Sequence, residues 1–171
     1  MIVNTNQLRD IIPSLRCGDR ILLSGTVYTA RDAVHKLLSH HIKNGDPLPF
    51  PIKDSVIYYA GPTETPPNLA IGSCGPTTSS RMDVYAPALL DMGLCAMIGK
   101  GPRNKDVIDA IVRNKAIYLC AIGGAGALAA RCIKSSQVVA FDFLGCESVK
   151  KIELDSFPLI VGIDCDGNSV F

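Results

Sequence analysis

The sequence has no excess of charge of one sign and no long hydrophobic run. Seventeen basic and sixteen acidic residues leave a formal net charge of +1, which gives no field strong enough to indicate binding to nucleic acid or to a membrane surface. No apolar run approaches the roughly 20 residues that span a membrane, and no charged segment followed by an apolar one marks a signal peptide. We therefore expect a cytoplasmic protein whose partners include neither nucleic acid nor a membrane.

Closely spaced cysteine pairs are also missing. The seven cysteines are far apart, with no Cys-x-x-Cys pair and mostly apolar neighbours, which indicates buried thiols in a reducing compartment. All three histidines belong to one predicted helix. His35 is expected on its charged side near the apolar face, while His40 and His41 supply favourable charge at its C-terminal end. We therefore predict no metal site and no cluster site within this chain.

The 171 residues are enough to bury one core, so residues 1–171 are expected to form a single domain. Apolar patterning predicts strands in 20–27, 55–60, 95–98 and 116–122. Between them it predicts helices that begin near Arg31, Arg81, Val107 and Ala127. The first of these should end at Gly45, and the second should be kinked at Pro87. After residue 133 three strand-like segments follow without a helix, at 138–144, 150–155 and 159–164. This order predicts an α/β fold with one mixed sheet covered by helices and a smaller second sheet built from N-terminal and C-terminal strands.

The densest chemistry lies in residues 75–83, Gly-Pro-Thr-Thr-Ser-Ser-Arg-Met-Asp. Because proline ends the preceding element, we expect a Thr or Ser here to cap the helix that starts near Arg81. Free N–H groups at the helix start and the guanidinium then suit a carboxylate or a phosphate. The hydroxyls of 77–80 could serve as substrate donors or in proton transfer, although caps and turns are their more frequent role. Asp83 is expected on another helix face and is not assigned as the base that a hydroxyl requires.

Three cationic side chains, Arg31, Arg81 and Lys100, follow strands or turns and stand among glycines. If they converge at the ends of their strands, they form a pocket suited to a small dicarboxylate. The alternative is that each is a solvated charge at the end of an element. The glycine-rich run 123–126 matches neither the dinucleotide nor the Walker pattern, so close packing of helix and strand is favoured over nucleotide binding.

Seven short motifs resemble, in the right order, the β subunit of the iron-sulfur (class I) fumarate hydratases and L-tartrate dehydratases. They are residues 29–36, 60–62, 75–83, 99–101, 122–124, 144–145 and 157–158. The resemblance extends from about Gly18 to the C-terminus. In that family the unit is a swivelling β/β/α three-layer domain, which occurs either at the C-terminus of a long fumarase or as a separate chain. The present sequence looks like the separate form.

The resemblance implies a 4Fe-4S cluster held by cysteines of a partner α subunit, with the substrate at the interface between the two subunits. It also implies that Arg31, Arg81 and Lys100 bind the dicarboxylate. Thr77 would hydrogen-bond the substrate and is a candidate for the proton-transfer group, assisted by an acidic residue of the partner. Ser80 occupies a position where many fumarases have glycine.

These observations predict the β subunit of a two-subunit class I fumarate hydratase, a hydro-lyase that reversibly hydrates fumarate to L-malate. An α2β2 hetero-oligomer with the α subunit is expected. One alternative is the β subunit of an L-tartrate dehydratase, and another is a non-catalytic swivelling domain that binds an anion or docks on a partner. We expect the isolated chain to fold, to be inactive and to self-associate as a homodimer through the surface that the α subunit covers.

Overall fold

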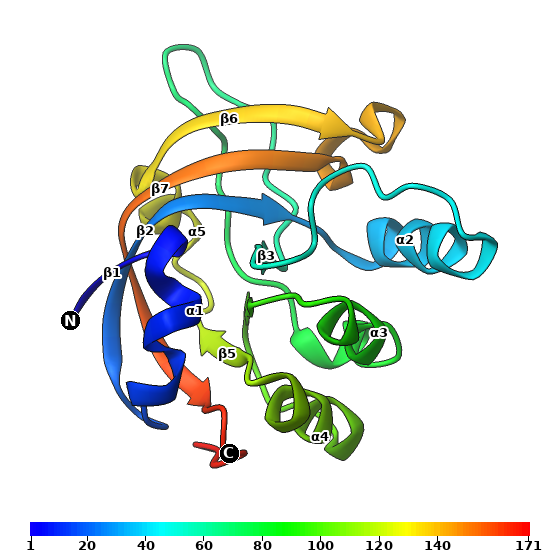
Figure 1. Cartoon of the computed structure of the whole chain (residues 1–171). Helices are drawn as coiled ribbons and strands as arrows, with labels where there is room; N and C mark the ends of the chain where they lie inside the picture. The colour runs from blue at the N-terminus through cyan, green and yellow to red at the C-terminus, as the bar shows by residue number, and fades with distance from the viewer.

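A single sheet of seven strands closes into a barrel (Figure 1). The computed structural model describes all 171 residues, Met1–Phe171. In chain order the strands are β1 (Ile2–Asn4), β2 (Arg20–Thr29), β3 (Val56–Tyr58), β4 (Ala96–Gly99), β5 (Ile117–Cys120), β6 (Ile133–Ala140) and β7 (Val149–Ile163). β2, β3, β4 and β5 are parallel neighbours, and β7 pairs antiparallel with both β5 and β2. These five strands close the barrel, and β1 and β6 lie outside it, paired with β2 and β7.

Three of the five α-helices lie together on one side of this barrel (Figure 1). The α-helices are α1 (Leu8–Ile11), α2 (Asp32–Asn44), α3 (Ala86–Asp91), α4 (Lys105–Asn114) and α5 (Gly126–Arg131). Four short 3-10 helices are η1 (Thr5–Gln7), η2 (Ile12–Ser14), η3 (Ser79–Met82) and η4 (Asp142–Glu147). Figure 1 shows α2, α3 and α4 together on the same side of the strands. No helix has both the length and the apolar character needed to cross a membrane.

The two longest helices begin and end at residues with clear local reasons. The side chain of Asn104 accepts a hydrogen bond from the backbone N–H of Val107 at 3.0 Å and so caps the start of α4. α4 ends at Lys115, which adopts the left-handed conformation. α2 has Asp32 in its first turn and ends at Gly45, where φ is 73°. The predicted end of this helix at Gly45 is confirmed.

Side chains of the central strands are buried on both faces, which explains their continuous apolar runs. In β3, Val56 and Tyr58 join a cluster inside the barrel, while Ile57 and the following Tyr59 join a second cluster under α2, α3 and α4. Successive side chains of a strand point to opposite faces, so each short strand contributes to both clusters. β2 instead alternates between buried and more exposed residues because only one of its faces packs on the barrel interior.

The predicted mixed α/β fold is confirmed, but the predicted second sheet is not separate. The N-terminal strand β2 and the C-terminal strand β7 do pair with each other, as expected. Each also hydrogen-bonds to the parallel strands, β2 to β3 and β7 to β5. The far wall of the barrel therefore takes the place of a second sheet. Local patterning predicts the strands but contains no information about which distant strands pair to close a barrel.

The C-terminal strands also differ from the prediction. The two strands predicted at 150–155 and 159–164 are one long strand, β7, which ends at Ile163 and bends where Ser156 adopts a left-handed φ of 54°. Pro158 lies just beyond this bend, which separates two apolar patterns and makes one strand look like two. The strand predicted at 138–144 begins earlier, at Ile133, and gives way to η4 from Asp142.

Candidate functional site

Arg31 lies between the end of β2 and the start of α2, in a crowded polar setting. Its Nη2 is 3.5 Å from Oε1 of Glu147, and its Nε is 3.8 Å from Oδ2 of Asp32. Gly61 packs directly on the side chain, since a Cβ atom there would lie 2.9 Å from both Cδ and Nη1. Nε of Arg31 is buried and has no hydrogen-bond partner. The guanidinium is thus held by carboxylates while one donor remains free.

Arg81 lies in η3 and reaches the same carboxylate. Its Nε donates a hydrogen bond to Oδ1 of Asp32 at 2.8 Å, and half of its side chain is exposed to solvent. Asp32 therefore directs one carboxylate oxygen toward each arginine, Oδ2 toward Arg31 and Oδ1 toward Arg81. The structure brings Arg31 and Arg81 together around one carboxylate, although the sequence places them 50 residues apart.

Lys100 is joined to the Arg81 segment through its backbone. Its N–H donates to Oγ of Ser79 at 3.0 Å, and its carbonyl accepts from the Ser79 N–H at 2.9 Å. Its side chain lies along Gly123, where a Cβ atom would be 3.3 Å from Cδ and 3.6 Å from Nζ. Lys100 forms no ion pair within the chain. Convergence is thus observed for the two arginines, whereas for the Lys100 ammonium it stays a prediction.

Thr77 is held by its backbone and keeps its hydroxyl free. Its N–H donates to the carbonyl of Tyr59 at 2.6 Å, just past the end of β3. The next residue, Thr78, forms a parallel bridge with Lys100. The Thr77 hydroxyl makes no hydrogen bond within the chain, and the residue is half-buried. The segment therefore lies between the ends of β3 and β4, and the Thr77 hydroxyl has no partner within the chain.

Ser79 is not the helix cap that the sequence suggests. The residue before η3 is Thr78, which makes no side-chain capping bond. Ser79 is fully buried, and its Oγ hydrogen-bonds the hydroxyl of Tyr118 at 2.8 Å besides accepting from Lys100. Tyr118 in turn donates to the carbonyl of Gly101 at 2.9 Å. A Cβ atom on Gly99 would overlap Ser79 Oγ, so this approach requires glycine there.

The helix predicted from Arg81 is interrupted. Residues 79–82 form only the short helix η3, and α3 begins at Ala86. Pro87 accordingly lies in the first turn of α3, where the missing N–H would have had no intrahelical partner. It starts this helix instead of kinking it.

A buried ion pair that the sequence does not reveal lies beneath this segment. Nε of Arg103 contacts Oδ1 of Asp83 at 2.6 Å, and Oδ2 of Asp83 accepts from the Asn104 N–H at 2.8 Å. The guanidinium lies over the rings of Tyr59 and Tyr118, with 5.3 and 5.1 Å to their centroids. Burial acts to lower the pKa of Arg103, but Tyr59 and Asp83 raise it overall, so the group stays charged. Neither residue stands out by spacing; the only sequence signal is that both are charged and close to the motifs at 75–83 and 99–101.

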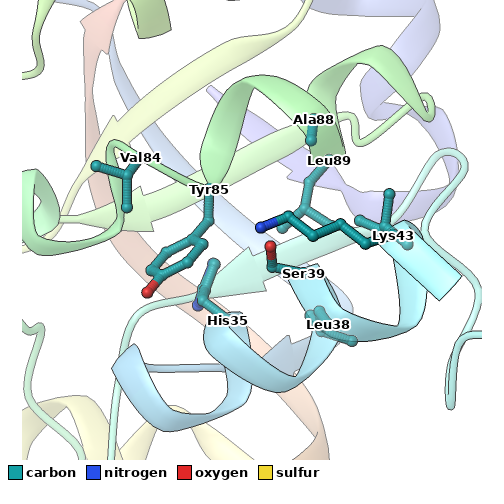
Figure 2. Close-up of a pocket in the computed structure, with 9 residues that line it drawn as sticks. His35, Leu38, Ser39, Lys43, Val84, Tyr85, Ala88 and Leu89 are labelled. Atoms are coloured by element: carbon teal, nitrogen blue, oxygen red, sulfur yellow. The ribbon is translucent and has the colours of Figure 1, made fainter.

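His35 is fully buried, contrary to the expectation that it lies on the charged side of its helix. Its Nδ1 lies 2.9 Å from the carbonyl of Arg31, and its ring packs edge-on against Tyr59 with centroids 5.3 Å apart. His35 lines a cavity of about 420 Å³ between α2 and α3. Figure 2 shows His35 at its wall and Lys43 extending across it. Burial lowers the pKa of His35 to about 4, against the small opposing effect of its bond to Arg31. The histidine is therefore neutral in the folded protein.

We predict that His35 makes the protein less stable in mild acid. Its pKa is about 4 in the folded chain and about 6.5 in an unfolded one. The unfolded state therefore takes up a proton that the folded state does not, and stability falls as the pH drops from 6.5 toward 4. The free energy of unfolding should decrease by on the order of 3 kcal/mol over this range. Urea unfolding at several pH values measures this slope. The slope should flatten in His35→Gln and persist in His40→Gln, whose histidine is exposed; an unchanged slope in His35→Gln would contradict the assignment.

The glycine-rich run at the start of α5 permits close packing, but not the predicted packing of helix on strand. A Cβ atom on Gly126 would overlap Ser73 Oγ and lie 3.1 Å from the backbone nitrogen of Gly75. The partner is thus the loop that leads into the candidate site and not a strand. Gly126 permits this loop to pass close to the start of α5.

No group of three or more His, Cys, Asp or Glu side chains lies together in a way that could hold a metal ion. The seven cysteines are free thiols, and Cys74, Cys95 and Cys165 are buried. Burial raises the pKa of Cys74 to about 12 and that of Cys95 to about 11, so both are protonated thiols at neutral pH. Cys146 is exposed, so the expectation of buried thiols holds for only part of the set.

Comparison with known proteins places the whole chain in one family. The model of the fumarase C-terminus matches residues 1–171. The chain is 40% identical over 168 residues to fumarate hydratase 2 of Leishmania major, and 44% identical over 154 residues to the aerobic class I fumarate hydratase of Escherichia coli K12. These matches cover 97% and 89% of this chain but only 30% and 28% of those proteins.

A third relative has a length similar to that of this chain. It is a Methanocaldococcus jannaschii protein provisionally named L(+)-tartrate dehydratase subunit beta, 38% identical over 166 residues. That match covers 94% of this chain and 85% of the relative. From the family match and these identities, the chain belongs to the class I fumarate hydratase family of hydro-lyases, in which it corresponds to the C-terminal domain and to the tartrate dehydratase β type.

Proposed function

We propose that this chain is the β subunit of a two-subunit class I fumarate hydratase and that residues 1–171 act as one unit. The observation that carries the proposal is the pair of arginines, Arg31 and Arg81, on one carboxylate. The free hydroxyl of Thr77 and the unpaired ammonium of Lys100 belong to segments joined to η3. Two guanidinium groups and one ammonium group supply positive charge and N–H donors suited to a small dicarboxylate.

Arg31 and Arg81 have donors left for a substrate. Asp32 occupies only Nε of Arg81 by a hydrogen bond, and no hydrogen bond within the chain uses Nη1 or Nη2 of either arginine. Asp32 and Glu147 orient the two guanidinium groups without using all the N–H groups of the arginines. One substrate carboxylate is proposed to bind these remaining donors, and Lys100 to serve as a point charge for the other.

The chemistry of hydration explains why cations are needed. Water adds across a C=C bond flanked by two carboxylates, and in the reverse direction a proton leaves the carbon next to a carboxylate. Negative charge then accumulates on that carboxylate, and preorganised cations stabilise it most where water is excluded. Thr77 is proposed to carry the proton between carbon and an acidic group of the partner, because a hydroxyl alone is a poor base.

The 4Fe-4S cluster implied by the family resemblance does not fit this chain. Its thiols are separate, and no cluster of metal-ligating side chains exists among its residues. We propose that the α subunit holds the cluster. The roles given above to Arg31, Arg81, Lys100 and Thr77 concern binding, charge and proton transfer, and they do not depend on the geometry of that cluster.

An exposed apolar surface next to Lys100 supports the proposal of a partner subunit. Ile122 and Leu128 are 66% and 62% exposed, and Ile122 is followed by the glycine that Lys100 lies along. Two adjoining hollows of about 470 and 280 Å³ share Ile122 and Pro158 in their walls. Burial of such a surface would drive association.

The β subunit of an L-tartrate dehydratase is the second candidate, favoured by the similar length of the Methanocaldococcus jannaschii relative. Tartrate carries one more hydroxyl than malate, and the groups that select it come in part from the α subunit. A non-catalytic domain that binds an anion is the third candidate. The uncommitted Thr77 hydroxyl, in a segment that leads into η3 and bridges to Lys100, argues against it.

Co-expression with the α subunit under anaerobic conditions, followed by assays of fumarate hydration and L-tartrate dehydration, tests the proposal. We expect the complex to hydrate fumarate, and the chain alone to fold but to have no activity with either substrate. Preferential dehydration of tartrate would favour the second candidate. Activity of the chain alone would contradict the two-subunit mechanism. Light scattering of the isolated chain tests self-association, which a strictly monomeric chain would contradict.

A further inference from the structure

The buried ion pair between Arg103 and Asp83 connects the two segments that carry the candidate cations. Asp83 follows Arg81 by two residues, and Arg103 follows Lys100 by three. The side chain of Arg103 has no exposed surface, and that of Asp83 is 6% exposed. Any shift of η3 relative to the loop after β4 would therefore separate two opposite charges within the protein interior.

Stability alone gives a weak reason for this pair. Taking two charges out of water costs several kcal/mol for each ion, and apolar side chains of similar volume are often as stabilising. The pair differs from an apolar contact in that it fixes direction and spacing. A planar guanidinium bound on several sides permits one arrangement of its neighbours, whereas packed methyl groups permit many.

The surroundings of Arg103 show this directional control. Besides Asp83, its Nη1 lies 3.4 Å from Sδ of Met97 in β4, and its Nη2 lies 3.4 Å from the hydroxyl of Tyr59. The rings of Tyr59 and Tyr118 lie against the guanidinium. Through these contacts Arg103 connects the end of η3 with β4, with the end of β3 and with β5.

We propose that Arg103 is a positioning residue, which through its ion pair with Asp83 sets the placement of Arg81 and Thr77 relative to Lys100. The catalytic consequence rests on the proposed function, whereas the placement itself does not. Oδ2 of Asp83 adds to the effect because it holds the Asn104 N–H at the start of α4. Both oxygens of this carboxylate therefore bind the segment that follows Lys100.

A second connection between the same segments depends on this placement. Because Tyr118 donates to the Gly101 carbonyl, the Ser79 hydroxyl donates to Tyr118 and accepts from the Lys100 N–H. This chain of three hydrogen bonds begins and ends in the loop that carries Lys100. The hydroxyl of Tyr118 is the middle member of this chain, and its ring lies against the Arg103 guanidinium. Loss of Arg103 should therefore loosen the bonds between Ser79 and Lys100.

The test is a double variant that leaves no charge unpaired, Asp83→Asn with Arg103→Met. The amide oxygen of the new side chain at position 83 can still accept from Asn104, and methionine fills much of the volume of arginine. We expect this variant to fold, with amide exchange at Ser79 and Lys100 faster by about tenfold, the loss expected for one hydrogen bond. The amide of Ile117, bonded to Cys95 within the sheet, should not change.

In the complex with the α subunit, kcat/KM of the double variant should fall by about 100-fold, the scale of a misplaced catalytic group. Arg103→Lys keeps the positive charge but lacks the planar guanidinium, so this variant should have less than full activity. The matched control is Asp91→Asn with Arg113→Met. That pair joins α3 to α4 at the surface, by hydrogen bonds of 2.8 and 2.7 Å. Its loss should leave kcat/KM within about twofold of the wild-type value.

The outcomes separate the positioning role from the proposed reaction. A folded double variant with wild-type exchange at Ser79 and Lys100 would overturn the positioning role, whichever reaction the complex catalyses. Wild-type kcat/KM in a folded double variant would do the same. If the wild-type complex acts on neither fumarate nor tartrate, the proposed function fails, and the exchange measurement, which needs no substrate, still decides the role of Arg103.

Discussion

Replacing Arg81 by alanine is expected to lower kcat/KM for fumarate hydration by about 10²–10³ in the complex with the α subunit, the cost of losing one preorganised donor to the developing charge. The substitution removes a guanidinium of which only Nε is engaged, by Asp32. It also leaves Asp32 to Arg31 alone, so the carboxylate shifts toward the remaining arginine and occupies donors meant for the substrate. The same loss is expected for L-tartrate dehydration if that is the reaction.

Arg113→Ala is the matched control for Arg81→Ala. Arg113 is 49% exposed where Arg81 is 50% exposed, and each donates its Nε to an aspartate at 2.8 Å. A half-exposed ion pair contributes little to stability, so both variants should unfold within about 1 kcal/mol of the wild type. Only Arg81→Ala should lose activity. Full activity in that variant would remove Arg81 from the site, and equal losses in both variants would indicate a general effect of removing surface charge.

The second large effect is expected from Thr77→Val, which removes a hydroxyl and keeps the shape of the side chain. If the hydroxyl transfers the proton, kcat should fall by about 10²–10⁴ with little change in stability. The fold should tolerate the change because Thr77 is held by its backbone N–H on the Tyr59 carbonyl. Its hydroxyl has no partner within the chain. Steady-state kinetics of the complex separates this loss in kcat from a rise in KM.

Thr78→Val provides the comparison for Thr77→Val. Thr78 is adjacent, exposed and also without a side-chain capping bond, so its substitution should leave kcat within about twofold. A rise in KM alone for Thr77→Val would assign the hydroxyl to substrate binding, since ground-state and transition-state binding would then be lost together. Unchanged kcat and KM would exclude Thr77 from both roles.

The positions of the candidate arginines could be predicted because they depend on local rules. Arg31 follows a strand and starts a helix, and Arg81 follows a Gly-Pro break, so both were expected where strands end. In the structure both arginines contact Asp32. The prediction for Lys100 depended on the same rule, but its side chain runs along Gly123, and its observed link to the site is through the backbone of Ser79.

Side-chain burial was harder to predict because it depends on what packs over a residue. A continuous helix from Arg81 would place Asp83 on another face, whereas η3 is short and turns this carboxylate inward onto Arg103. Ser79 was expected to cap a helix and instead lies inside the protein. His35 is expected on the charged side of α2, yet it is covered by Tyr59, which follows β3 and is not part of the helical pattern.

By itself, the sequence determined the alternation of strands and helices, the end of α2 at Gly45 and the local positions of Arg31, Arg81 and Lys100. These follow from apolar period, glycine and proline, which act over a few residues. Only the tertiary structure decided that β2 and β7 close one barrel and that Asp83 pairs with Arg103. Pairings of this kind join residues that are distant along the chain, and their free energy comes from burial and geometry that exist only once the strands have assembled.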